Sequence, residues 1–170
     1  MARYFFTFSL IILAVISRLL PHPPNFVPIT ALALFGGVYL DKKHTFIVPL
    51  AAMLISDYLI GFYAGMMWIY ASLIAIGFLG LWLRRNHNLS CTFFATLSGS
   101  ILFYVITNLG VWFSSPGMYP HNFTGLIECY IAAIPFFRNT LLGDVFYVGV
   151  MFGVFELARR YVPSLKAQAT

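Results

Sequence analysis

Five ionisable side chains interrupt long apolar runs of this chain, and these are the residues that could do chemistry. They are Arg18, Asp57, Glu128, Arg138 and Asp144. A charged side chain at membrane depth costs several kcal/mol, so such residues usually face a cavity or a partner and mark function. The pattern predicts a polar binding site inside an apolar protein.

Amide and aromatic side chains accompany these charges. Tyr104, Asn108 and Trp112 recur every four residues and therefore share one face of a predicted helix. Asn25 stands just before another apolar run. Because a few convergent polar groups orient a ligand in an otherwise apolar pocket, we expect these four residues and the five charged ones to form a substrate-binding set. Trp112 also suits an aromatic belt at a membrane interface.

Other interpretations of the same residues stay open. Asp57 and Asp144 could pair with Arg18 and Arg138 and hold helix ends together. Paired carboxylates could also serve as acid and base in a membrane enzyme that acts on a lipid-linked substrate. A third hypothesis is an assembly protein without a ligand, because small-residue pairs such as Ala33/Gly37 let helices pack closely.

Metal and nucleotide chemistry have little support in the sequence. His22, His121 and Cys129 are the weak candidates for metal ligands, since two loop histidines without a third ligand are usually solvated and a lone cysteine is usually a small buried residue. The sequence has no nucleotide-binding loop, HExxH, GxSxG or CxxC pattern. We therefore expect no metal, no cofactor and no ATPase or other enzyme activity of its own.

The composition places these residues in a membrane protein. The 170 residues are 61% hydrophobic and 9% charged, with a mean hydropathy of +0.87. A soluble domain carries about 25% charged residues. The net charge of +5 sits in short clusters between apolar runs, which indicates membrane topology rather than nucleic-acid binding.

The apolar runs predict an all-α integral membrane protein with one domain over residues 1–170. Gly125–Phe137 is too short to cross and ends near Pro135, so we expect an interfacial or re-entrant helix there. The six predicted spans are residues 4–20, 25–40, 45–63, 67–83, 89–113 and 139–161.

Loop charge predicts the orientation. With both termini in the cytoplasm, eight of the ten Lys and Arg residues lie on the inner side, and only Arg18 and Arg138 lie on the outer side. Asp57, Asn108 and Asp144 then fall in the outer half of their spans. The sequence thus predicts a cavity open to the outside, covered by residues 114–138 and lined by these three residues.

Four stretches resemble a known group of proteins: NFVPITALALFGGVYL, ISDYLIGFY, FYVITNLGVW and GLIECYIAAIPFFRNTLLGD. They resemble an uncharacterised bacterial family of small six-span transport-type proteins. That family is distantly similar to the substrate-binding S-components of energy-coupling-factor (ECF) transporters. The resemblance covers about Asn25–Phe155.

This resemblance implies a protein of the bacterial cytoplasmic membrane that captures a vitamin or other micronutrient from the outer face. It also implies a possible partner, a transmembrane coupling subunit powered by ATPases. Many S-components carry an Ala-x-x-x-Ala docking pair in the first helix, whereas the first run of this chain has no small pair four residues apart.

Overall fold

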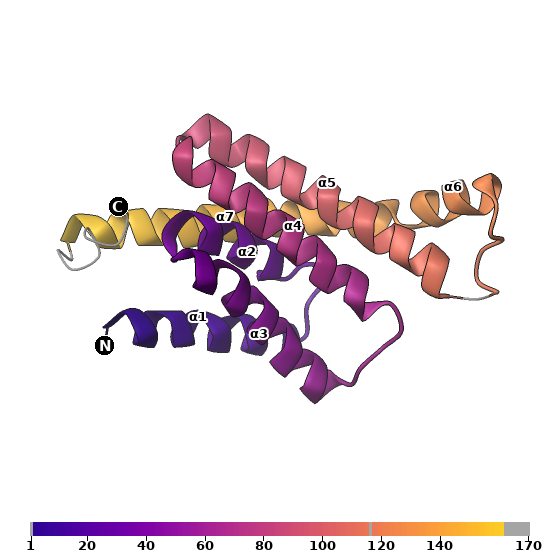
Figure 1. The fold of residues 1–170 in the computed structure, drawn as a ribbon, viewed down its shortest axis with the longest axis horizontal. Helices are drawn as coiled ribbons and strands as arrows, with labels where there is room; N and C mark the ends of the chain where they lie inside the picture. Colours follow the sequence, from indigo (N-terminus) through magenta and orange to yellow (C-terminus); the bar gives the residue numbers. More distant parts are fainter. Residues whose placement is uncertain (1, 116, 162–170) are drawn as a thin grey trace.

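The computed structural model describes residues 2–115 and 117–161, and these residues form seven α-helices and no strand (Figure 1). The long helices lie roughly side by side, and the start of α1 and the end of α7 lie at the same end of the view (Figure 1). The all-α prediction is confirmed. The elements are α1 (Ala2–Leu19), α2 (Ile29–Tyr39), α3 (Lys42–Ile60), α4 (Met66–Arg85), α5 (Leu89–Ser114), α6 (Phe123–Ala132) and α7 (Ile134–Tyr161).

Four of the helices, α3, α4, α5 and α7, are long and apolar enough to cross a membrane, which indicates a membrane protein. The predicted count of six spans is not confirmed. The helix α2 has 11 residues and therefore rises about 16 Å, roughly half of a hydrocarbon core. It begins only at Ile29, because four prolines at positions 21–28 keep the preceding segment out of the helix.

The predicted helix over Gly125–Phe137 is wrong in its bounds. The segment divides into α6, which ends at Ala132, and the start of α7 at Ile134. Pro135 lies in the first turn of α7, where its missing N–H group costs no helical hydrogen bond. The last long helix therefore begins before the predicted position 139, and Asp144 lies about three turns inside it.

The short helix α2 is the centre of the bundle. Every one of its residues is buried, and it packs against α3, α4, α5 and α7. Its closest neighbour is α4, where Gly37 lies against Gly80. A Cβ atom on Gly80 would lie 2.7 Å from the carbonyl oxygen of Leu34 and 3.3 Å from that of Ala33. The backbones can meet only because both contact positions lack side chains, as the Ala33/Gly37 pair predicts.

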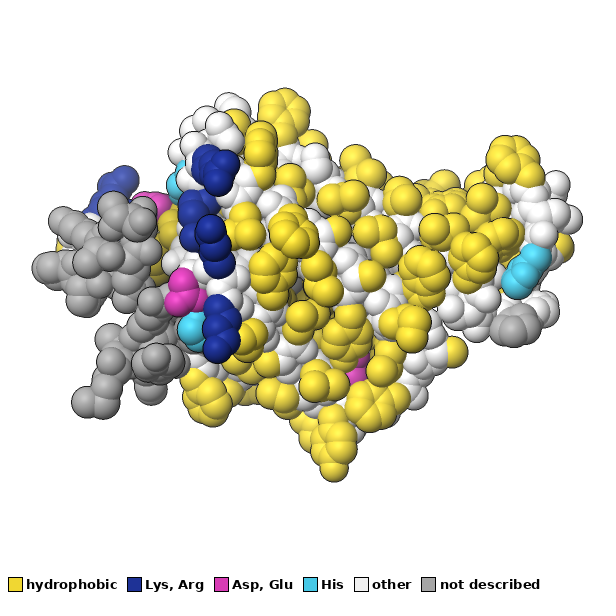
Figure 2. Space-filling view, viewed as in Figure 1, with side chains coloured by type: hydrophobic (Ala, Val, Ile, Leu, Met, Phe, Trp, Pro, Cys, Tyr) yellow, Lys and Arg dark blue, Asp and Glu magenta, His cyan; other side chains and the backbone are white. Residues whose placement is uncertain are grey.

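Basic residues gather at one end of the molecule, which we call the basic end (Figure 2). Arg84 there donates from Nε to the carbonyl oxygen of Gly37 (2.8 Å) and from a terminal nitrogen to that of Leu40, so it satisfies carbonyl groups at the end of α2. The connections after α1, α3 and α5 lie toward the opposite end (Figure 1). The basic end comprises Lys42, Lys43, Arg84, Arg85, Arg159 and Arg160.

The glycine contact predicts a specific loss of stability. We expect Gly80→Leu to lower the free energy of unfolding by about 1–3 kcal/mol or more, because the new side chain forces α2 and α4 apart. Unfolding in detergent micelles measures this change. Gly153→Leu is the matched control, since a Cβ atom there meets no atom within 4 Å. Equal stability of the two variants would contradict the close packing.

Candidate binding site

Two adjoining cavities lie in the half of the bundle away from the basic end. The main cavity has a volume of about 380 Å³ and is lined by α5, α6 and α7 together with the connections before α2 and before α6. The side cavity has a volume of about 280 Å³ and reaches toward α1 and α3. Asn25, Ile69, Phe103 and Thr140 line both. The two hollows therefore form one candidate site.

One face of α5 supplies most of the polar lining of the main cavity. Tyr104, Thr107 and Asn108 lie on this face, as predicted for Tyr104 and Asn108 from their spacing. The amide nitrogen of Asn108 donates to the carbonyl oxygen of Tyr104 (2.8 Å). The amide oxygen of Asn108 has no hydrogen-bond partner within the described residues, so it can accept a hydrogen bond from a ligand.

The segment 20–28 brings Asn25 to both cavities. Asn25 has a φ of 62°, a left-handed conformation that asparagine tolerates better than most residues. The amide nitrogen of Asn139 on α7 donates to the carbonyl oxygen of Pro24 (3.0 Å) and fixes the segment. Gly143 leaves space for Phe26, whose atoms would lie 3.3 Å from an added Cβ. Asn25 thus borders both cavities, but it lies in a proline-rich segment rather than at the start of a helix as predicted.

The helix α6 covers the main cavity and is fastened to α5. Asn122 caps its start by accepting a hydrogen bond from the backbone of Gly125 (2.9 Å). The hydroxyl of Tyr104 donates to the carbonyl oxygen of Tyr130 (2.5 Å), and the hydroxyl of Tyr130 donates to that of Val105 (2.7 Å). These contacts make α6 a fixed wall.

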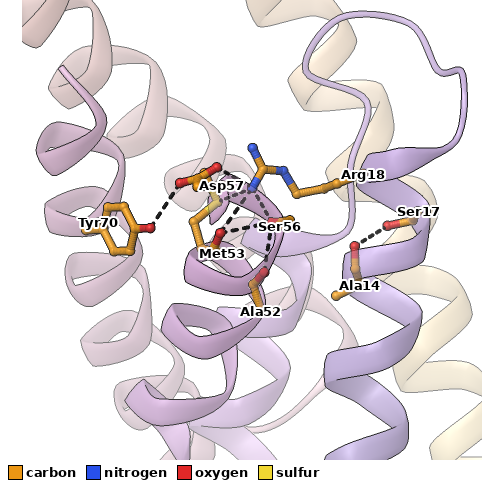
Figure 3. Close-up of polar contacts among 8 residues, drawn as sticks. All are labelled: Ala14, Ser17, Arg18, Ala52, Met53, Ser56, Asp57 and Tyr70. Carbon is orange, nitrogen blue, oxygen red and sulfur yellow. Dashed lines mark hydrogen bonds and ion pairs between the residues drawn. The ribbon is translucent and has the colours of Figure 1, made fainter. Parts of the chain in front are cut away.

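Arg18 and Asp57 form a buried ion pair at the side cavity (Figure 3). Arg18 reaches from α1 to α3, and its terminal nitrogen lies 2.8 Å from Oδ1 of Asp57 and also contacts the hydroxyl of Ser56. The hydroxyl of Tyr70 on α4 donates to the other carboxylate oxygen of Asp57 (2.9 Å). Arg18 lines the side cavity, whereas Asp57 lies behind it and is fully buried.

Tyr63 lies beside this ion pair, in the connection between α3 and α4, and also lines the side cavity. Burial raises the pKa of its phenol, and the nearby carboxylate of Asp57 raises that pKa further. The phenol therefore keeps its proton at neutral pH and can donate a hydrogen bond toward the cavity.

Asp57, Asn108 and Asp144 do not line a common cavity, which corrects the prediction of a shared lining. Asn108 lines the main cavity, Asp57 lies behind the side cavity, and Asp144 borders only a separate small void. The carboxyl group of Asp144 is hydrogen-bonded to the hydroxyl of Ser100 on α5 (2.7 Å). Thr30 on α2 borders the same small void and also lines the side cavity. A buried carboxylate needs hydrogen-bond donors, and the nearest ones turn Asp144 away from the larger hollows.

The remaining predicted site residues lie outside the cavities. Glu128 and Arg138 are exposed, so the alternative pairing of Arg138 with Asp144 is not found either. Trp112 donates from its indole nitrogen to the carbonyl oxygen of Pro120 (2.9 Å) and packs on His121, so it supports the connection to α6. Of the two cationic candidates, only Arg18 borders the site.

The weak candidates for metal binding do not come together. Cys129 is buried and lines the main cavity, with its sulfur 3.4 Å from the carbonyl oxygen of Asn108. His22 and His121 are exposed. Within the described part of the chain, no three His, Cys, Asp or Glu residues form a group that could hold a metal ion.

A third hollow, the α5–α7 groove, lies near the basic end. It has a volume of about 460 Å³ and is strongly apolar along most of its length. Its polar end holds Glu156 and His87, and the hydroxyl of Tyr39 donates to Glu156 (2.6 Å). Burial lowers the pKa of His87, which therefore stays neutral at neutral pH.

The sequence analysis missed a row of hydroxyl side chains on α5 that runs from the α5–α7 groove to Asp144. Thr92, Thr96 and Ser100 are spaced by four residues on α5 and are all buried. Thr30 and Thr140 were missed as well, although both border the side cavity. The four-residue spacing was visible in the sequence, but threonine and serine in apolar helices rarely stand out from ordinary packing.

The comparison with known proteins adds a family but no activity. Residues 1–165 match a family described as a family of unknown function, DUF6580. No curated protein and no solved structure shows a significant match.

The ion pair of Arg18 and Asp57 predicts strong energetic coupling. Asp57→Asn should lower the free energy of unfolding by about 3–5 kcal/mol, because it leaves the arginine buried without its counter-charge. The double variant Arg18→Met/Asp57→Asn should recover part of this loss in a double-mutant cycle measured by chemical unfolding.

Tyr70→Phe is the matched control for this cycle. It removes one hydrogen bond to Asp57 without removing a charge, and we expect a loss of about 1 kcal/mol. Purely additive effects of the Arg18 and Asp57 substitutions would contradict a coupled pair.

Proposed function

The chain belongs to this family of unknown function, and from the geometry of its site we propose that it is a membrane-embedded binding protein for a small molecule. The observation that carries the proposal is the pair of adjoining cavities, of about 380 and 280 Å³, whose walls combine apolar side chains with a few polar groups. Ligand pockets are typically concave, mostly apolar and about 300–1,000 Å³ in volume.

The lining favours a neutral ligand with both aromatic and hydrogen-bonding character. Among the described lining residues, Arg18 is the only one with a charge, and Asp57 compensates it. Amides from Asn25 and Asn108 and a phenol from Tyr63 offer donors and acceptors. Phe103 and neighbouring aromatic side chains offer flat apolar contacts, which suit a ring system.

The distribution of charge supports an orientation for this binding protein. The basic end suits the cytoplasmic face, because short cytoplasmic loops are enriched in Lys and Arg. The cavities then lie in the outer half, and both termini lie inside. In this proposal α1 and the short α2 join the four long helices as membrane segments, which gives six in all.

The resemblance to the S-components of ECF transporters supports uptake of a micronutrient as the purpose of binding. Such a protein hands its ligand to a coupling subunit with ATPases or moves it alone. The enzyme hypothesis receives less support, because Asp57 and Asp144 contact different partners and border no common cavity. The hypothesis of an assembly protein without a ligand does not explain two adjoining cavities with several polar groups in their walls.

Native mass spectrometry of the detergent-purified protein tests the proposal. We expect a small molecule to leave with the wild-type protein, and Asn108→Leu to lower its occupancy at least tenfold, or about 1.4 kcal/mol, because leucine keeps the shape of asparagine but removes the hydrogen-bonding amide. Asn86→Ala is the matched control, since Asn86 is exposed near the basic end and contacts only the carbonyl oxygen of Trp82.

Two outcomes would contradict the proposal. One is equal occupancy in wild type and Asn108→Leu. The other is a wild-type protein that carries no small molecule and becomes more stable when Asn108→Leu removes the amide from the hollow, as expected of an assembly protein with no ligand to bind.

A further inference from the structure

The hollows of this protein form a series that is interrupted at Asp144. The side cavity and the small void share Thr30, and the void and the α5–α7 groove share Thr96 and Val148. The void itself has no room for a water molecule. Asp144 therefore lies at the closed point between a cavity on one side of the bundle and a groove that leads to the basic end.

The surroundings of Asp144 contain no compensating charge. Asp144 is 2% exposed. Among the described residues, no Lys, Arg or His nitrogen lies within 4.0 Å of its carboxyl group. The void is bordered by uncharged side chains from every helix that packs there: Thr30, Ala31 and Leu34 on α2, Ile76 on α4, Thr96 on α5 and Val148 on α7. Asp57, by contrast, has Arg18 at 2.8 Å.

The hydrogen bonds around Ser100 can accommodate a neutral carboxyl group. The hydroxyl oxygen of Ser100 lies 2.7 Å from Oδ2 of Asp144 and 3.1 Å from the carbonyl oxygen of Thr96. Ser100 has a single hydrogen and cannot donate to both acceptors at once. Ser100 donates to Asp144 when the carboxylate is ionised; when Asp144 carries a proton, its O–H group donates to Ser100 and Ser100 donates to Thr96, so the added proton finds an acceptor.

We propose that Asp144, together with Ser100 and Thr30, is a proton-binding site enclosed between the two hollows. The proton comes from water in one hollow and binds a carboxylate oxygen; on release it returns to water in the other. A sodium ion does not fit, because the void has no room even for a water molecule. An ionisable residue at membrane depth is typical of proton-coupled carriers.

The site is closed, not part of a continuous proton path. The hydroxyls of Thr92 and Thr96 donate to carbonyl groups one turn earlier in their own helix, each at 2.8 Å. They therefore offer no free relay from Asp144 to Glu156. Release toward the basic end requires the helices α5 and α7 to separate along the groove. Any coupling of this step to solute movement rests on the proposed function, whereas protonation of Asp144 does not.

Infrared spectroscopy of protein labelled with ¹³C-aspartate tests the site. At neutral pH we expect the wild-type protein to show the carbonyl band of a protonated aspartic acid, and Asp144→Asn to lose that band completely. The melting temperature of Asp144→Asn should stay unchanged, because an amide replaces a neutral carboxyl group of the same shape.

Asp41→Asn is the matched control. Asp41 caps α3 at the basic end, and asparagine caps a helix equally well, so this variant should keep both the fold and the band. Absence of the band in wild type, its survival in Asp144→Asn, or its loss when sodium replaces choline in the buffer would each overturn the proposal. An empty cavity in mass spectrometry would leave this result unaffected, so the two proposals fail separately.

Discussion

The contact between Gly37 and Gly80 is the constraint on which the rest of this structure depends. It lets α2 lie directly on the backbone of α4, so that a helix of 11 residues can be surrounded by α3, α4, α5 and α7. Aromatic rings of Phe35, Tyr39 and Phe155 pack together on the other side of α2, with centroids 4.3 to 5.3 Å apart. The space around α2 is therefore filled toward the basic end, and α2 stops before the opposite end.

The prolines before α2 explain why the half of the bundle away from the basic end is hollow. A full-length helix at the position of α2 would occupy the space that the side cavity now takes. Instead, the prolines at 21, 23, 24 and 28 end helical structure, and the segment bends to place Asn25 against both cavities. The same interruption exposes Thr30, in the first turn of α2, to the side cavity and to Asp144. The close packing around α2 and the position of the two cavities therefore both follow from the shortness of this helix.

The sequence predicted the helical class, the clusters of basic residues and the small-residue face of α2 correctly, because apolar runs and loop charges are local signals. It also identified the residues Asn25, Tyr104, Asn108 and Arg18 that border the cavities. The sequence could not show that Asp57 and Asp144 bind different partners, Arg18 and Ser100, and line no common cavity. Which donor reaches a buried carboxylate depends on how helices rotate against each other, and spacing within one helix does not determine that rotation.

Two buried acids in one bundle illustrate two ways to place a carboxyl group away from water. Asp57 retains a counter-charge from Arg18 and a hydrogen bond from Tyr70, and the resulting pair ties α1, α3 and α4 together. Asp144 is hydrogen-bonded to the hydroxyl of Ser100 on α5 and has no counter-charge within 4.0 Å among the described residues. An ion pair of the first kind is a fixed structural element, because separating it leaves two uncompensated charges. A carboxyl group without a counter-charge loses no ion pair when the neighbouring helices move. In our proposal, Asp57 is therefore the fixed charge beside the side cavity, and Asp144 is the group between the hollows that gains and releases a proton.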